Sequence, residues 1–233
     1  MFSCRILVYF SLFPMMLLGQ HTNTHGNVIW ANYNNSFFLD SNWSIANDVQ
    51  IRTQDEIDKW SLFALRTGIV YRINKNVAVT AGVAWFGTMN YFNEKPVMAN
   101  EWRPWQEISF QREIKAVKFI QRVRLEQRFL QKLSGGKRID DFETRHRLRY
   151  RFEFGYPVNK KLSMSAGNEV MTNLNYIKDI RFFDQNRTFL SVNFKLSHFT
   201  VFHFQYIRLV QWRSASKVLE NNNVFRFGIQ QQF

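Results

Sequence analysis

The chain has 233 residues, with 31 Lys and Arg against 18 Asp and Glu and a single cysteine, Cys4. One cysteine excludes a disulfide framework, and no segment beyond the N-terminal region approaches the roughly 18 consecutive apolar residues of a membrane helix. The basic residues alternate with apolar ones and do not gather in a tail or on a helix face, so we expect no nucleic-acid partner.

Residues 1–19 have the layout of a secretory signal peptide. Arg5 precedes an apolar run that is too short to cross a bilayer as a helix, and the small residue Gly19 follows it. We expect cleavage after Gly19 and a single mature domain over 20–233. Because Cys4 lies at the start of the signal, we expect neither a lipid anchor nor thiol chemistry.

Eleven segments are predicted to be β-strands, because apolar and polar residues alternate in them and turn-forming residues separate them. In chain order they are 27–38, 42–54, 60–73, 77–88, 102–114, 117–131, 141–155, 161–173, 186–197, 200–212 and 223–233. The stretch 113–133 is also rich in helix formers and allows one apolar helix face. We prefer a strand there because its Arg-Val-Arg-Leu-Glu alternation matches that of the next segment.

The clearest alternation lies in two neighbouring segments. Over 142–154, Phe, Thr, His, Leu and Tyr side chains point to one face and Glu and Arg to the other, and 119–129 repeats the pattern. A soluble sandwich would bury the apolar face against a second sheet. A membrane barrel instead presents that face to lipid and turns the charged face to its lumen.

The joins between the segments favour the barrel. Short joins, near 39–42, 73–76, 112–118, 155–161 and 196–199, alternate with mostly longer and more polar ones, near 55–59, 89–101, 132–140, 174–185 and 213–222. Transmembrane barrels alternate short turns with longer external loops in this way. We therefore predict an all-β fold, an antiparallel up-and-down transmembrane β-barrel of 10–12 strands. Because bacterial single-chain barrels have even strand numbers, either 27–38 is not a full strand or a twelfth is unassigned.

The final segment resembles the assembly signal of outer-membrane barrels. Its apolar face is formed by Phe225, Phe227, Ile229 and the last residue, Phe233. We expect this strand to engage the barrel-assembly machinery and the protein to lie in the bacterial outer membrane, in contact with lipid and lipopolysaccharide.

The charged face of the two best strands predicts a ladder of side chains in the lumen. Its residues are Arg122, Arg124, Glu126, Arg128, Glu143, Arg145, Arg147, Arg149, Arg151 and Glu153, with Glu169, Glu107 and Asp184 as further acids to offset the arginine excess. Opposite charges paired across strands stabilise a sheet and like charges destabilise it. The ladder either fills a narrow lumen as a structural device or attracts an anion such as phosphate, sulfate or an acidic sugar. We favour the structural interpretation.

No residues point clearly to catalysis, a metal or a cofactor. His146 lies two residues from Thr144 on the apolar face, where a lipid-facing hydrolase would hold its base and nucleophile. The nearby Gln121 and Gln127 are uncertain orienting groups, and no Gly-x-Ser-x-Gly elbow is present. The remaining histidines lack the spacing of a metal site.

Three motifs are similar to those of a known family, namely Arg145-His-Arg-Leu-Arg-Tyr-Arg151, Arg122-x-Arg-x-Glu-x-Arg128 and Phe183-Asp-Gln-Asn-Arg187. Together with Trp30 in the first segment, they resemble the domain of unknown function 2490 family, outer-membrane proteins of the Bacteroidetes type. The resemblance extends over essentially the whole mature chain. It implies a β-barrel in the outer membrane and supplies no catalytic residues.

The sequence therefore predicts a barrel that is not an enzyme and carries no cofactor or metal. We expect a structural or surface-binding role with a largely closed, Arg- and Glu-lined lumen and with loops near 89–101 and 174–185 as the binding surface. At the barrel mouth, Asp184, Asn186 and Arg187 are expected to form a cap by charge-assisted hydrogen bonds to the lumen arginines. The alternatives are a small anion-selective channel and a lipid-facing hydrolase.

Overall fold

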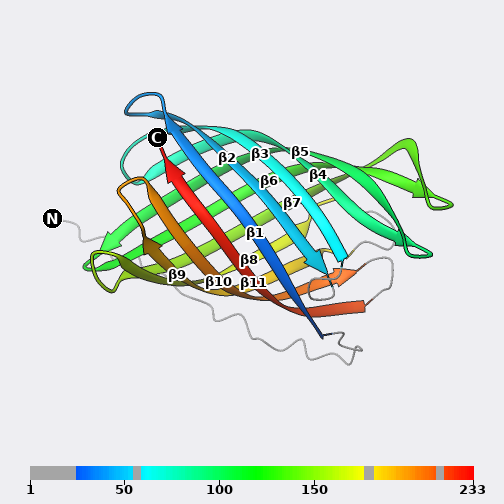
Figure 1. Ribbon diagram of the computed structural model, residues 1–233. Helices are drawn as coiled ribbons and strands as arrows, with labels where there is room; N and C mark the ends of the chain where they lie inside the picture. The colour runs from blue at the N-terminus through cyan, green and yellow to red at the C-terminus, as the bar shows by residue number, and fades with distance from the viewer. Residues whose placement is uncertain (1–24, 55–58, 176–180, 214–217) are drawn as a thin grey trace.

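The structure, a computed structural model, describes residues 25–54, 59–175, 181–213 and 218–233, which form a β-barrel (Figure 1). Its strands are β1 (His25–Phe38), β2 (Trp43–Gln54), β3 (Lys59–Arg72), β4 (Val77–Phe92), β5 (Lys95–Ile114), β6 (Val117–Ser134), β7 (Lys137–Pro157), β8 (Leu162–Asn173), β9 (Phe183–Lys195), β10 (Thr200–Arg213) and β11 (Val218–Gln232). None of the described residues forms a helix long and apolar enough to cross a membrane.

All eleven segments expected from the alternation are strands. The helical alternative for 113–133 is wrong, because β6 occupies most of that stretch and pairs along its length with β5 and β7. The expected signal peptide, 1–19, lies outside the described residues.

The barrel closes through a parallel pair of strands. Each strand from β1 to β11 pairs antiparallel with the next, and β1 then pairs in parallel with β11, which places Trp30 beside Arg226. Backbone bonds from Phe38 N to Phe233 O at 2.8 Å and from Phe233 N to Ser36 O at 2.9 Å complete this seam. The expectation of an even number of strands is therefore wrong for the described barrel, and the expected antiparallel pairing fails only between β1 and β11. An odd number of strands can close an up-and-down barrel only when the first and last strands run in the same direction.

Two joins that were expected to be long are tight turns. Asn93 and Glu94 join β4 to β5, and Gly135 and Gly136 join β6 to β7, all four with φ between 47° and 72°. Two successive residues with positive φ are characteristic of the type I′ turn, which suits the twist of a hairpin.

The polar segments on either side of these turns are strand, not the loops expected near 89–101 and 132–140. β7 alone has 21 residues, about twice the 9–11 that cross a bilayer at a tilt. The two hairpins therefore project beyond the other strands at one end of the barrel (Figure 1).

Four joins at the other end of the barrel share one design. They cover 39–42, 73–76, 158–161 and 196–199. In the first, the Asp40 carboxylate accepts the backbone N–H groups of Trp43 and Asn42, both at 2.7 Å. These donors hold the pKa of Asp40 below its usual value. Asn, Asn and Ser occupy the equivalent position in the other turns and accept the same kind of bond, which fixes the turn without a glycine.

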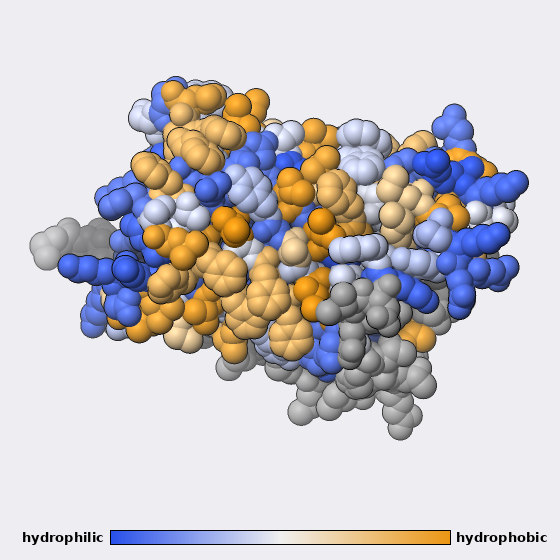
Figure 2. All heavy atoms as spheres, viewed as in Figure 1, coloured by the Kyte–Doolittle hydropathy of each residue, from blue (hydrophilic) through white to orange (hydrophobic). Residues whose placement is uncertain are grey.

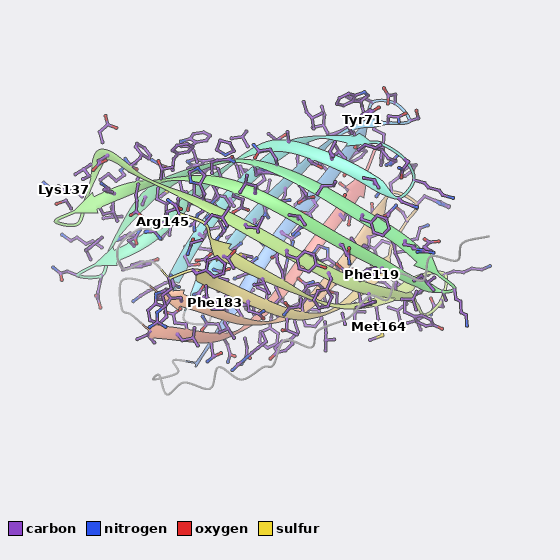
Figure 3. The ribbon with its side chains drawn as sticks, turned by 180° about the vertical axis from the view of Figure 1, so that it is seen from behind. Tyr71, Phe119, Lys137, Arg145, Met164 and Phe183 are labelled. Carbon is purple, nitrogen blue, oxygen red and sulfur yellow. The ribbon has the colours of Figure 1, made fainter. Side chains whose placement is uncertain are left out.

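The outer wall of the barrel is apolar and the inner wall polar. Apolar side chains gather across the middle of the face in Figure 2, with hydrophilic ones at the hairpin end. In Figure 3, Phe119 and Met164 lie toward one end of the barrel and Lys137 at the hairpin tip at the other. Leu190 is 62% exposed on the outside, whereas Arg149 is only 6% exposed on the inside. An apolar exterior around a charged interior is the pattern of a transmembrane β-barrel.

On the inner wall, Trp105 of β5 packs across two glycines. A Cβ at Gly68 would lie 2.8 Å from Trp105 Cζ2, and one at Gly82 would lie 2.6 Å from the same atom and 2.3 Å from the Thr67 carbonyl oxygen. These separations are too short for any side chain, so the close approach of the indole to β3 and β4 requires glycine at both positions.

We predict that Gly82→Ala destabilises the folded barrel by about 1–3 kcal/mol, because the added methyl group overlaps the Thr67 carbonyl and the Trp105 ring. The measurement is the urea midpoint at which the folded, heat-modifiable band is lost in gel electrophoresis. Gly155→Ala is the matched control, since the nearest atom to its Cβ would be 3.8 Å away. Equal midpoints for the two variants would contradict the steric argument.

Candidate functional site in the barrel lumen

The residues predicted for the lumen ladder lie on the inner face of β6, β7 and β8. β6 and β7 pair as expected, with Glu126 opposite Arg147 and Arg124 opposite Arg149. Arg145 is the ladder residue labelled on β7 in Figure 3. Because several arginines directly face other arginines, carboxylates must reach between them to offset the repulsion.

Two buried glutamates link these arginines into one network. Glu126 accepts hydrogen bonds from Arg147 Nε at 2.9 Å and from Arg149 Nη1 at 2.7 Å. Glu169 accepts two from Arg149 Nη2, at 2.8 and 2.9 Å, and one from Arg122 Nη2 at 2.6 Å. Each carboxylate is 3% exposed. Since Arg149 bonds both, the charges of β6, β7 and β8 are joined without a break.

A third buried carboxylate, Glu101 of β5, was missed by the sequence analysis. It accepts from Arg103 at 2.5 and 2.8 Å and from Arg128 at 2.6 and 3.2 Å. The alternation of the sequence could have revealed it, because the inward-facing side chains of this strand lie at every second position, namely Glu101, Arg103, Trp105 and Glu107. The expected strand began at 102, so Glu101 was left in the preceding loop.

The remaining ladder acids each have an arginine partner. The pairs are Glu107 with Arg124 at 2.7 Å, Glu143 with Arg145 at 2.5 Å, and Glu153 with Arg151 at 2.5 Å. These bonds connect residues of one strand or of neighbouring strands, so the paired charges lie along one wall of the barrel, from β5 to β8.

The expected barrel-mouth cluster is only partly assembled. Asp184 accepts a bond from Arg147 Nη1 at 3.0 Å, and Arg187 Nη1 lies 3.5 Å from Glu169 Oε2. Asn186 does not join them. Its side chain lies on the outer face, where Asn168 Nδ2 donates to it at 2.9 Å. Asn186 directly precedes the inward-facing Arg187, and adjacent residues of a strand point to opposite faces.

The opposite wall carries arginines without such compensation. Among the described residues, neither Arg52 of β2 nor Arg226 of β11 has a carboxylate within ion-pair distance. Arg52 donates to Gln50 Oε1 at 2.7 Å and stacks 3.9 Å above the Trp30 ring. Arg226 donates to Asn32 Oδ1 at 2.8 Å. Both contacts are with neutral groups, so the two positive charges remain unbalanced.

These side chains border a cavity of about 430 Å³ in the lumen. In the described part of the chain its lining includes eight arginines and three carboxylates, together with amides and hydroxyls. The charged lining residues are Arg52, Arg66, Arg122, Arg124, Arg149, Arg151, Arg187, Arg226, Asp48, Glu153 and Glu169. A space bounded mainly by one sign of charge concentrates ions of the other sign.

His146 lies on the outer face, and its backbone forms a hydrogen bond with a neighbouring segment. Its N–H donates to Asn175 Oδ1 at 2.8 Å, and Asn175 Nδ2 donates to the Thr144 carbonyl at 3.0 Å. Within the described residues, no hydrogen bond joins the His146 ring to the Thr144 hydroxyl. The cross-strand neighbour Gln127 bonds Gln106 at 3.0 Å. This arrangement fixes the middle of β7 against the segment after β8.

The apolar residues of the final strand lie on the outer face as expected. Phe227 and Ile229 are each 41% exposed and Phe233 is 55% exposed, while Phe225 packs against Tyr206 with ring centroids 5.7 Å apart. Phe233 also stacks on Phe37 of β1 at 5.2 Å. The last residue of the chain thus contributes to the seam between β1 and β11.

The fold, the apolar exterior and the arginine-rich interior define a transmembrane β-barrel with a charged lumen. The profile of the family described as "Protein of unknown function (DUF2490)" matches residues 27–220, so the chain belongs to this family, as the resemblance predicted. A crystal structure of the NanC porin has a similar fold, with a TM-score of 0.55 and 13% sequence identity, over 88% of this chain and 99% of that chain. No curated protein matches the chain.

We predict that Glu126→Gln destabilises the barrel by about 3–5 kcal/mol, because it leaves Arg147 and Arg149 buried without their shared carboxylate. The urea midpoint of unfolding measures the effect. The matched control is Asp141→Asn, which removes the charge that pairs with Lys132; these side chains are 53% and 45% exposed, so little or no loss of stability is expected. Similar losses in both variants would show that the lumen network contributes no more than a surface pair.

Proposed function

We propose that the protein is a narrow pore that conducts small anions across the bacterial outer membrane. The observation that carries this proposal is the lumen cavity of about 430 Å³ with eight arginines and three carboxylates in its lining. Anions are attracted into such a space and cations are repelled from it, because the surrounding wall has low dielectric and focuses the field.

The two walls of the lumen support this function in different ways. On β5 to β8 the arginines are held by Glu101, Glu126 and Glu169, which leaves them little freedom to bind a passing ion. On β2 and β11, the hydrogen bonds of Arg52 and Arg226 to described residues go to neutral amides, Gln50 and Asn32. A passing anion therefore interacts mainly with the second wall, while the first keeps the barrel rigid.

A closed structural barrel is the second candidate, and one observation favours it. The buried network around Glu126 and Glu169 occupies much of the interior, and a barrel of this size has room only for side chains or one small ligand. In this case surface binding would be the remaining role. A measurement of ion conduction distinguishes the anion pore from the closed structural barrel.

We predict that the protein in a planar bilayer gives small, steady currents whose reversal potential under a potassium chloride gradient lies toward that of chloride. Arg52→Gln is expected to reduce this selectivity because it removes an unbalanced lumen charge. Arg208→Gln is the control, since Arg208 lies on the outer face of β10 and bonds Asn223. Silence of the wild-type protein, or cation selectivity, would overturn the pore and leave the closed barrel.

We also propose that the N-terminal segment 1–19 exports the chain and that the β11 strand with Phe233 presents it to the barrel-assembly machinery. The exposed apolar face of that strand supports this proposal. We predict that the wild-type protein fractionates with the outer membrane and that removal of Phe233 lowers the amount of folded, heat-modifiable protein. Wild-type protein in the soluble periplasm would contradict both expectations.

We propose in addition that the barrel is not a lipid hydrolase, since the contacts near His146 involve backbone and amide groups. Purified protein is expected to release no fatty acid from phospholipid or lipopolysaccharide. Release that disappears in His146→Ala, with folding intact, would reverse this conclusion.

A further inference from the structure

Two arginines of the lumen lie over one aromatic ring, and a third lies beside it on the neighbouring strand. Arg52 Cζ lies 3.9 Å from the centroid of Trp30, and Arg187 Cζ lies 5.1 Å from the same centroid. Arg226 is the register partner of Trp30 across the β1–β11 seam. Two guanidinium groups, from β2 and β9, therefore lie over a single buried indole on β1, and a third arginine, on β11, is the neighbour of that residue across the seam.

This cluster has much less negative charge than it needs. Within the described residues, Arg52 and Arg226 donate hydrogen bonds to neutral amides, Gln50 and Asn32. Among the described residues, the only carboxylate within ion-pair distance of any of the three is Glu169, which lies 3.5 Å from Arg187 and is already bonded to two other arginines. Like charges held together in a partly buried space repel one another strongly unless an anion lies between them.

Unused hydrogen-bond donors border the same cavity. Arg187 Nε and Trp105 Nε1 are buried and have no hydrogen-bond partner in the part of the chain that the structure describes, and both residues line the cavity. Trp105 is only 6% exposed. A buried donor without an acceptor is costly, so these groups point to an acceptor that the protein does not itself supply.

We propose that Arg52, Arg187 and Arg226 form a binding site for a small oxyanion, a phosphate or a carboxylate, within the lumen. Guanidinium groups bind both anions through paired N–H donors, and the cavity of about 430 Å³ accommodates a small organic molecule bearing either group. The amides and hydroxyls of the lining, such as Gln205 and Ser191, offer hydrogen bonds to its neutral part. The site deepens the proposed function and rests on it for the route by which the anion enters.

The test uses the full-length protein, folded in detergent micelles and titrated calorimetrically with inorganic phosphate and, separately, with gluconate. Ionic strength is kept constant with potassium chloride. We expect saturable binding of at least one of the two anions. Binding of phosphate would show that the site recognises a phosphate group, and binding of gluconate that it recognises a carboxylate. Arg52→Gln and Arg226→Gln should each weaken binding about tenfold, the loss of one charge-assisted contact, while Arg208→Gln on the outer wall leaves it unchanged. Absence of saturable binding of both anions, or equal binding in all variants, would overturn the site.

A second measurement distinguishes a binding role from a structural one. If Arg226 contacts the bound anion, Arg226→Gln should reduce the rise in thermal unfolding temperature that the anion gives the wild-type protein. A lower unfolding temperature with undiminished stabilisation by the anion would assign Arg226 to the scaffold and overturn its place in the site.

The results also separate this site from the pore. Anion-selective currents together with phosphate and gluconate binding that is unaffected by Arg52→Gln and Arg226→Gln would refute the site and leave the pore. Binding that both variants weaken, in a barrel without conductance, would support the site and refute the pore.

Discussion

The interior of this barrel depends on carboxylates that are each shared between arginines. β6 and β7 bring arginines face to face, an arrangement that by itself opposes strand pairing. Glu126 and Glu169 lie between these residues and are linked through Arg149. A buried ion-pair network of this kind contributes less to net stability than its many bonds suggest, because desolvation of each charge offsets much of the attraction. Its effect is to fix which strand faces lie together.

Aromatic rings provide the second means of holding guanidinium groups inside the barrel. Arg103 stacks on Phe86 at 3.7 Å, Arg124 on Trp105 at 4.0 Å and Arg151 on Phe189 at 4.4 Å. Such contacts attract the cation to the face of the ring without neutralising it. The lumen therefore holds arginines in fixed positions while keeping a net positive charge, and this combination allows one structure to be both rigid and attractive to anions.

Alternation of side chains was sufficient to predict every strand, because period two is unambiguous wherever one face is apolar and the other charged. It did not predict how far four of the strands extend into 89–101 and 132–140, where the regular alternation of apolar and polar residues is lost. The shared charged surface of β6 and β7 followed from their alternation, but the register that sets Glu126 opposite Arg147 was not predicted. The cluster around Trp30 could not be predicted, since Arg52, Arg187 and Arg226 come from distant segments that only the closure of the barrel brings together. The parallel seam left no local signal, because each strand of the pair has an ordinary alternating sequence.

The odd number of strands has a topological consequence for the chain. With eleven described crossings, the start of β1 and the end of β11 emerge on opposite sides of the bilayer, whereas an even barrel returns both to one side. His25 is on the side of the long hairpins and Phe233 on the side of the four-residue turns. An odd number of strands cannot be divided wholly into hairpins, so ten of the described strands can enter the membrane as five hairpins, and one strand must insert without a hairpin partner of its own.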